Sequence, residues 1–234
     1  LDELSNERIG EEWRKLLLRS DRPSVGLEAM LESKVIEKLH PELQALVDTP
    51  QDPQWHPEGD VWVHTLLVTD AAAEIVRREA YNDETALMVL LGALCHDLGK
   101  PETTEFLEGH WRSRGHCEAS EVPTRTFLSK LALSNDITER VVRLVREHLW
   151  PSLNFERERL TFTAGDGAIR RLANRLHPVT IAELLAVAEA DRRGRTNVDT
   201  DFPEGPALLD RAAELQVDVD KPEPLLLGRH LIEL

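Results

Sequence analysis

Apolar side chains recur every three or four residues along almost the whole chain, which is the spacing of one face of an α-helix. Runs of alternating β-branched residues, which would predict strands, are not evident in the sequence. The predicted helices cover residues 6–18, 23–46 with a break near His40-Pro41, 60–78, 83–98, 116–133, 135–149, 166–176 and 178–193, with shorter ones from Glu204 and Pro224. The pattern therefore predicts an all-α fold.

Two segments between these helices have the composition of turns. Residues 49–59 are rich in proline and other turn-forming residues, so we expect a loop that separates an N-terminal helical piece from the rest. Between Gly99 and Gly115, the pair Glu108-Gly109 predicts a small β-hairpin.

The charge balance restricts the classes of partner. The chain has 28 basic and 43 acidic side chains, a net charge of −15. Such a surface repels polyphosphate backbones, which argues against a general nucleic-acid-binding protein. Six arginines would form a local basic patch, unless they are simply solvated on helix faces. They are Arg170, Arg171, Arg175, Arg192, Arg193 and Arg195.

Cysteine content and hydropathy bear on the cellular compartment. Cys95 and Cys117 are too few for a disulfide framework, so we expect a reducing cytoplasm. The longest apolar run, residues 86–95, is about half the ~20 residues that a membrane helix needs, so no membrane partner is predicted. The acidic first residues lack the apolar stretch of a secretory signal. Because the chain begins with Leu rather than Met, the sequence is compatible with an upstream segment.

Residues able to bind metal occur where apolar residues are expected. His64, His148 and Asp191 each fall in the apolar stripe of a predicted helix. His96 and Asp97 directly follow the most apolar stretch of the chain. The pattern assigns no role to the remaining isolated histidines, which are His40, His110, His177 and His230.

Each of these polar residues taken alone has an ordinary structural interpretation, such as a histidine bonded to a backbone carbonyl. Taken together, several imidazoles and carboxylates buried without partners would cost several kcal/mol for each group. A divalent cation satisfies such a set, because neutral imidazole and carboxylate both bind first-row metals. The sequence therefore predicts a metal site.

The order of these residues resembles a known signature. His64, His96-Asp97 and Asp191 are similar to the H…HD…D pattern of HD-domain metal-dependent phosphohydrolases. The flanking residues resemble the HD region of bacterial tRNA nucleotidyltransferases, the family of CCA-adding enzymes and poly(A) polymerases. The likeness is carried by residues 54–65, 93–101 and 115–116, by the neck-like residues 7–17, and by residues 168–173 and 226–232.

The resemblance implies a division of the chain and leaves one part of the family without a counterpart. It implies a helical neck-like segment at residues 1–50, an HD phosphohydrolase domain at 51–200 and a C-terminal helical extension at 201–234. The Gly-rich strand–turn and paired-Asp motif of the family's nucleotidyltransferase head are not found, and Asp199-Thr-Asp201 lies in a Pro-flanked loop. Nucleotide addition by these residues alone is therefore not expected.

The resemblance also implies a set of metal ligands. One divalent ion would be held by His64, His96, Asp97 and Asp191. His116 and His148 extend the order to that of the binuclear members of the superfamily, in which the Asp of the HD pair bridges two metals. A second ion would then bind to Asp97, His116 and His148, although both histidines also have a structural interpretation. The expected cofactor is one or two divalent ions per chain, Mn, Ni, Mg or Fe.

Metal-bound water with a pKa near ~7 would supply hydroxide for phosphate-ester hydrolysis, with His96 and Asp97 as the catalytic pair. The resemblance implies substrates of the RNA-end type, which are 2′,3′-cyclic phosphates, 2′-nucleotides or phosphomonoesters. Arg170 and Arg193 would help to bind a nucleotide or the 3′ end of a tRNA.

Residues near the HD pair are candidates for supporting roles. Lys100 is placed to hold a phosphate as a point charge, or is a solvated surface side chain. His56 and Glu58 are either partners that orient the metal ligands or plain loop residues. Gly99 is expected to permit a sharp turn after the HD pair.

Two other functions compete with phosphohydrolysis. The chain could instead be the non-catalytic tRNA-binding body of a split or truncated tRNA nucleotidyltransferase, working with a separate nucleotidyltransferase head. The complete set of metal-binding residues and the charge of −15 favour the enzyme. A cyclic-nucleotide or alarmone hydrolase of the wider superfamily ranks third, because it shares the site but not the flanking segments.

Overall fold

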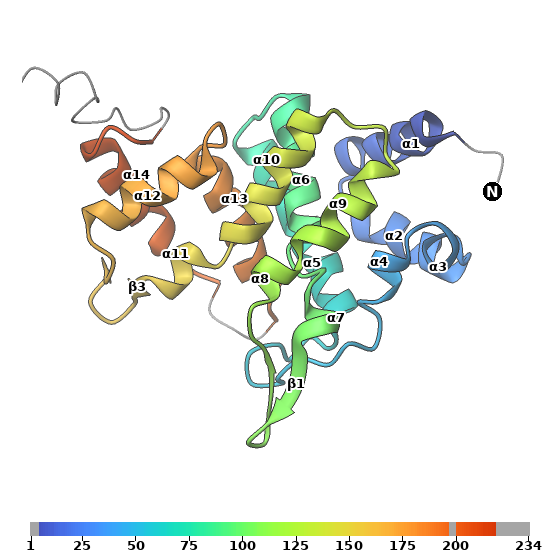
Figure 1. The fold of residues 1–234 in the computed structure, drawn as a ribbon, viewed down its shortest axis with the longest axis horizontal. Helices are drawn as coiled ribbons and strands as arrows, with labels where there is room; N and C mark the ends of the chain where they lie inside the picture. The colour runs from blue at the N-terminus through green and yellow to red at the C-terminus, as the bar shows by residue number, and fades with distance from the viewer. Residues whose placement is uncertain (1–4, 197–199, 219–234) are drawn as a thin grey trace, which may run out of the picture.

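Helices make up most of the computed structural model, which describes residues 5–196 and 200–218 (Figure 1). The helices are α1 (Asn6–Arg19), α2 (Pro23–Glu32), α3 (Val35–Leu39), α4 (Pro41–Gln44), α5 (Val61–Arg78), α6 (Asp83–Cys95), α7 (Lys100–Thr103), α8 (His116–Ala119), α9 (Glu121–Ser129), α10 (Asn135–Glu147), α11 (Trp150–Leu153), α12 (Asp166–Leu176), α13 (Ile181–Arg193) and α14 (Glu204–Glu214). Two short antiparallel hairpins complete it: β1 (Thr104–Leu107) with β2 (His110–Ser113), and β3 (Phe155–Glu156) with β4 (Thr161–Phe162). The predicted all-α fold class is confirmed.

Helix α6 lies at the centre and packs against α5, α10 and α13. It is apolar on every side, and all its residues from Ala86 to Cys95 are buried. A helix that offers no polar face to water is stable only inside a protein. Its C-terminal end therefore carries the HD pair, His96 and Asp97, into the interior.

Side-chain caps set where the central helices begin. Asp60, Asn82 and Ser134 each accept a hydrogen bond from the backbone N–H three residues later, at the starts of α5, α6 and α10. Helix α13 begins with a reciprocal capping box between Thr180 and Glu183. Each cap fixes the register of its helix and therefore the face on which the later polar residues lie.

The N-terminal helices α1–α4 flank one side of the central helices, and α11, α12 and α14 flank the other (Figure 1). Trp13 of α1, His40 between α3 and α4, and Phe127 of α9 meet edge to face, with ring centroids 5.1 to 5.2 Å apart. One hydrophobic core extends from Trp13 to Val217. The core includes residues on both sides of positions 50 and 200, where the predicted segments meet. The division into segments 1–50, 51–200 and 201–234 therefore stays a prediction.

The structure divides some predicted helices. The range 23–46 contains three helices, and its predicted break at His40-Pro41 is confirmed. The range 116–133 contains two, α8 and α9, which meet at Ser120. There the Ser120 hydroxyl accepts from the Gly99 N–H at 2.8 Å and donates to the His96 carbonyl at 3.1 Å. Through these two hydrogen bonds, Ser120 connects the junction of α8 and α9 to the HD pair and the turn that follows it.

The predicted hairpin at Glu108-Gly109 is confirmed as β1–β2, which projects from the body of the molecule (Figure 1). The hairpin β3–β4 was not predicted, because strands of two residues are too short to show alternation. The predicted helix from Pro224 and the family-like segment 226–232 lie outside the described residues. Among the helices of the described ranges, none combines the length and the apolar character needed to cross a membrane.

Candidate metal centre

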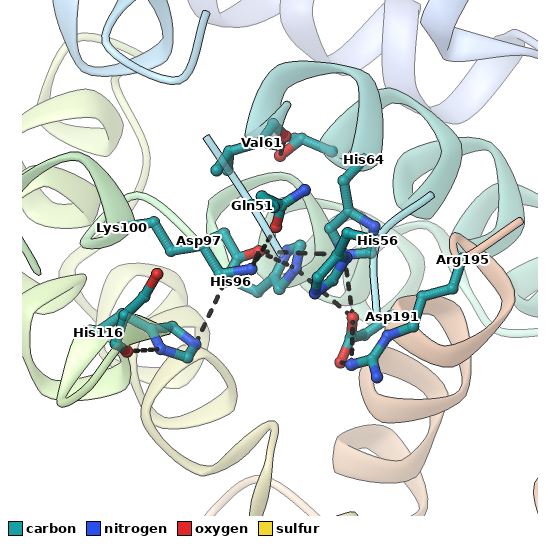
Figure 2. Close-up of polar contacts among 12 residues, drawn as sticks. Gln51, His56, Val61, His64, His96, Asp97, Lys100, His116, Asp191 and Arg195 are labelled. Carbon is teal, nitrogen blue, oxygen red and sulfur yellow. Dashed lines mark hydrogen bonds and ion pairs between the residues drawn. The ribbon is translucent and has the colours of Figure 1, made fainter. Parts of the chain in front are cut away.

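Helix ends bring the predicted ligands into one buried cluster (Figure 2). His64 lies in the first turn of α5, the HD pair follows α6, and Asp191 lies in the last turn of α13. His116 begins α8, and His148 caps the C-terminal end of α10. All six side chains belong to residues that are at most 9% exposed: His64, His96, Asp97, His116, His148 and Asp191.

The ligand atoms of this cluster lie within a few ångströms of one another. His64 Nε2 is 3.0 Å from Asp191 Oδ1 and 3.9 Å from Asp97 Oδ2. His96 Nε2 is 3.0 Å from Asp97 Oδ2 and 3.9 Å from Asp191 Oδ1. On the other side, His116 Nε2 lies 3.3 Å from Asp97 Oδ1. Asp97 therefore has one oxygen toward each half of the cluster.

Three of the histidines are oriented in the same way. The Nδ1 atoms of His96, His116 and His148 each lie 2.7 Å from the backbone carbonyl oxygen three residues earlier. A carbonyl only accepts hydrogen bonds, so Nδ1 carries the proton and the lone pair of the neutral ring is on Nε2. Burial lowers the pKa of His148 to about 3 and also lowers that of His116, which keeps both rings neutral. Neutral imidazole is the form that binds metal.

The donor chemistry of the cluster fits a cation. The buried Nε2 of His96 has no hydrogen-bond partner among the described residues. Its neighbour at 3.0 Å is the carboxylate oxygen of Asp97, which is also an acceptor. Two acceptors that face each other in a buried site repel one another, and a cation bound between them relieves that repulsion. Ligand atoms of His64, His96 and Asp191 lie within 4.8 Å of one another, as do those of His96, Asp97 and His148.

A carboxylate on the loop before α5 orients His64. Glu58 Oε1 lies 2.8 Å from His64 Nδ1 and 2.9 Å from His56 Nδ1, and its side chain is 1% exposed. Burial raises the pKa of Glu58, but the contacts with the two imidazoles outweigh it and hold the pKa well below its ordinary value. Burial lowers the pKa of His64, yet the carboxylates of Asp191 and Glu58 raise it overall. His64 therefore presents Nε2 to the cluster with a carboxylate behind it, as metal-binding histidines commonly do.

Two cationic side chains pair with the buried aspartates. Lys100 Nζ lies 2.7 Å from Asp97 Oδ2 and 2.6 Å from Gln51 Oε1. Arg195 Nη2 lies 3.0 Å from Asp191 Oδ2. Burial raises the pKa of both carboxyls, but His96 and Lys100 at Asp97, and Arg195 and His64 at Asp191, hold the pKa values well below the ordinary range. Both aspartates are therefore ionised and able to bind metal.

The cluster opens into a cleft of about 390 Å³. Lys100, His116, His148 and both aspartates line it, together with Arg195. Arg170 and Arg193, the predicted substrate contacts, do not line it. Arg170 donates to the carbonyl of Leu215, and Arg193 pairs with Glu74 and Glu189. Arg170, Arg193 and Arg195 lie close together in the sequence, but of these three only Arg195 lines the cleft.

Sequence reasoning missed the role of Arg195, although a signal was present. Residues four apart lie on one face of a helix, so Arg195 is placed to pair with Asp191.

The structure corrects the explanation for Gly99. Its φ of −86° is open to any residue, but a Cβ would lie 2.4 Å from the carbonyl oxygen of His116 and 2.5 Å from the amide nitrogen of Ser120. Gly99 is needed for close packing of the HD turn on α8 rather than for the turn itself.

The family of the chain follows from comparison with known proteins. The family model described as "HD domain" matches residues 61–193, the part that holds the helices of the cluster. The chain belongs to the HD-domain family. This superfamily consists of metal-dependent phosphohydrolases. A second model, "Probable RNA and SrmB- binding site of polymerase A", matches residues 1–46.

Curated relatives add a narrower similarity. The chain is 33% identical over 213 residues to a protein of Xanthomonas campestris pv. campestris strain B100 named "Multifunctional CCA protein". Proteins of the same name from Cupriavidus metallidurans and Pasteurella multocida are 32% and 34% identical over 216 and 210 residues. These alignments cover 87–89% of this chain and 47–48% of each relative. The chain thus spans about half the length of these relatives, and the predicted resemblance to the HD and neck region of the CCA-adding family is confirmed.

Proposed function

We propose that this chain is a metal-dependent phosphohydrolase that hydrolyses nucleotide or RNA-end phosphate esters, either 2′,3′-cyclic phosphodiesters or phosphomonoesters. The observation that carries the proposal is the contact between His96 Nε2 and Asp97 Oδ2, two buried acceptors 3.0 Å apart. A polar core of this kind is costly to fold unless a cation occupies it. Its position in a cleft gives that cation access to a substrate.

The six residues divide into two ligand sets that share Asp97. One set is His64, His96, Asp97 and Asp191, and the other is Asp97, His116 and His148. Divalent ions bound there would polarise a phosphoryl group and provide hydroxide from water near neutral pH. Because imidazoles form half of the first set and two of the three ligands of the second, Ni and Fe suit the donors better than Mg, which prefers oxygen ligands.

The chain's own side chains have distinct tasks around the reacting phosphate. Lys100 and Arg195 are the cationic groups of the cleft next to Asp97 and Asp191, so they are placed to bind phosphoryl oxygens. Gln51 fixes the position of the Lys100 ammonium. Glu58 holds His64 in one orientation, and the carbonyls behind the other imidazoles do the same for them.

The charge balance of the cluster supports a resident cation. Asp97, Asp191 and Glu58 supply three buried carboxylates, whereas Lys100 and Arg195 supply two cations. With His64 neutral, as a metal ligand must be, one negative charge is in excess, and a divalent ion would neutralise it.

A second candidate function is the tRNA-binding body of a nucleotidyltransferase, with a tRNA 3′ end and a separate head as partners. The match of residues 1–46 to an RNA-binding family model favours it. It does not account for the buried ligand cluster, and the net charge of −15 opposes broad contact with tRNA phosphates. Both candidates are compatible with the predicted cytoplasmic location.

The test is hydrolysis of 2′,3′-cyclic AMP by the purified chain with added Mn or Ni and after chelation. Asp97→Asn and the matched surface variant Asp210→Asn run in parallel, since Asp210 is exposed on α14. We expect metal-dependent turnover that Asp97→Asn abolishes and Asp210→Asn retains. Activity that survives in Asp97→Asn would come from a contaminating phosphatase. No turnover with any metal, together with tRNA binding, would transfer the assignment to the second candidate.

A further inference from the structure

Two tryptophans line the metal cleft without contributing a metal ligand. Trp55 belongs to the loop before α5 and is 57% exposed, whereas Trp111 belongs to β2 and is half-buried. Both line the same cleft as Asp97 and Lys100. Exposed tryptophan is uncommon, and at the mouth of a polar cleft it is a typical contact for a ligand.

The two segments that carry these tryptophans are tied together. Asp52 accepts from His110, with an Oδ2–Nδ1 distance of 2.8 Å, and its backbone carbonyl accepts from the Trp55 N–H at 3.0 Å. His110 directly precedes Trp111, so this contact links the loop to the β1–β2 hairpin. Phe106 packs against Trp111 with a centroid distance of 5.0 Å. The rings are therefore held at the cleft rather than left free on separate loops.

Two leucines at α11 add apolar surface to the cleft. Leu149 and Leu153 also line the cleft, and Leu153 is 74% exposed. The cleft thus combines a charged floor, formed by the metal-ligand cluster with Lys100, and an aromatic and apolar rim. A complementary ligand carries phosphate at one end and a flat apolar ring at the other.

We propose that Trp55 and Trp111 bind the base of a nucleoside phosphate while its phosphate reaches the metal-ligand cluster. This inference rests on the proposed phosphohydrolase function and assigns the residues that would distinguish a nucleoside phosphate from a sugar or alkyl phosphate. Indole rings stack on any base, because every base has a π-face. The rim therefore selects for the presence of a base with little preference among bases.

The test measures binding of 2′-AMP by calorimetry to the wild-type chain, to Trp55→Ala and to Trp55→Phe. Loss of base stacking is expected to raise the Kd of Trp55→Ala roughly 5- to 150-fold. The ring of Trp55→Phe should recover most of the affinity, whereas ribose 5-phosphate, which has no base, should bind equally to all three proteins. Val122→Ala removes a side chain that is 71% exposed on α9, outside the cleft, and should leave the Kd unchanged. Circular dichroism checks that each variant is folded.

Two results would overturn the inference: an unchanged Kd for 2′-AMP in both Trp55→Ala and Trp111→Ala, or absence of 2′-AMP binding to the wild-type chain. The test of base binding and the test of the proposed hydrolysis can fail independently of each other. Hydrolysis of 2′,3′-cyclic AMP with the same KM in wild type and both alanine variants would refute base binding while supporting the enzyme. Tight, Trp55-dependent binding of 2′-AMP without any hydrolysis would support the base site and refute the enzyme.

Discussion

His40 provides a pH-dependent test of how the N-terminal helices are held to the rest of the chain. The Trp13 indole N–H donates to His40 Nε2 at 3.0 Å, which requires an unprotonated nitrogen. Burial, with a smaller contribution from the charge of Lys130, lowers the pKa of His40 to about 4. Phe127 packs against the same ring and excludes water. Protonation of His40 is therefore unfavourable in the folded state and easy in the unfolded chain.

The direction and size of the effect follow from linkage. The pKa of His40 rises from about 4 in the folded state to its ordinary 6.5 on unfolding. Between these values the unfolded chain binds more protons, so stability is fully present above pH 6.5 and is lost as the pH falls toward 4. From pH 7 to pH 5, the contribution of His40 to the free energy of unfolding should fall by about 2 kcal/mol.

The assay is urea denaturation at pH 7 and pH 5 of the wild type and of His40→Gln. The Gln amide oxygen can accept from Trp13 and does not titrate, while the other buried histidines titrate equally in both proteins. We expect the wild type to lose about 2 kcal/mol more than the variant between the two pH values. Equal losses in both proteins would refute the argument, because His40 would then titrate alike in the folded and unfolded states.

Two further predictions concern the site and its packing. Glu58→Gln removes the negative charge behind His64, so metal affinity should fall roughly 10- to 100-fold in a metal titration with unchanged helical content; an unchanged affinity would contradict a positioning role. Gly99→Ala places a Cβ 2.4 Å from the His116 carbonyl oxygen, a backbone atom that cannot move freely, so urea denaturation should show a loss of roughly 1–3 kcal/mol. Gly165→Ala, where a Cβ meets open space, should cost less than about 1 kcal/mol, and equal costs at the two glycines would contradict the packing explanation.

Most of the candidate ligand set was predictable because five of its six members break a local pattern. His64, His148 and Asp191 interrupt apolar stripes, and the HD pair ends the most apolar helix of the chain. Such departures are visible without the fold, since burial can be inferred from helical periodicity. The resemblance to the HD family then placed His116 in the same group, and the structure brings all six residues together.

The surroundings of the ligands could not be predicted in the same way. Arg170, Arg193 and Arg195 belong to one cluster of arginines in the sequence. Apart from the four-residue spacing between Asp191 and Arg195, nothing in the sequence shows that Arg195 alone of the three lines the cleft. Trp55 and Trp111 lie in a loop and a hairpin, where helical periodicity says nothing about direction. Their shared position depends on the Asp52–His110 contact, which joins residues far apart in the chain.

Local spacing was thus sufficient for most of the helices, for the loop at 49–59 and for selecting five of the six candidate metal ligands, because these depend on a residue's place within its own element. The proton positions on the imidazoles, the cationic partners of the aspartates and the aromatic rim required the packed molecule. His64 and Asp191 are 127 residues apart, yet their ligand atoms are separated by 3.0 Å. Such a distance is set by how α5 and α13 pack on α6, and helical periodicity within one segment carries no information about that packing.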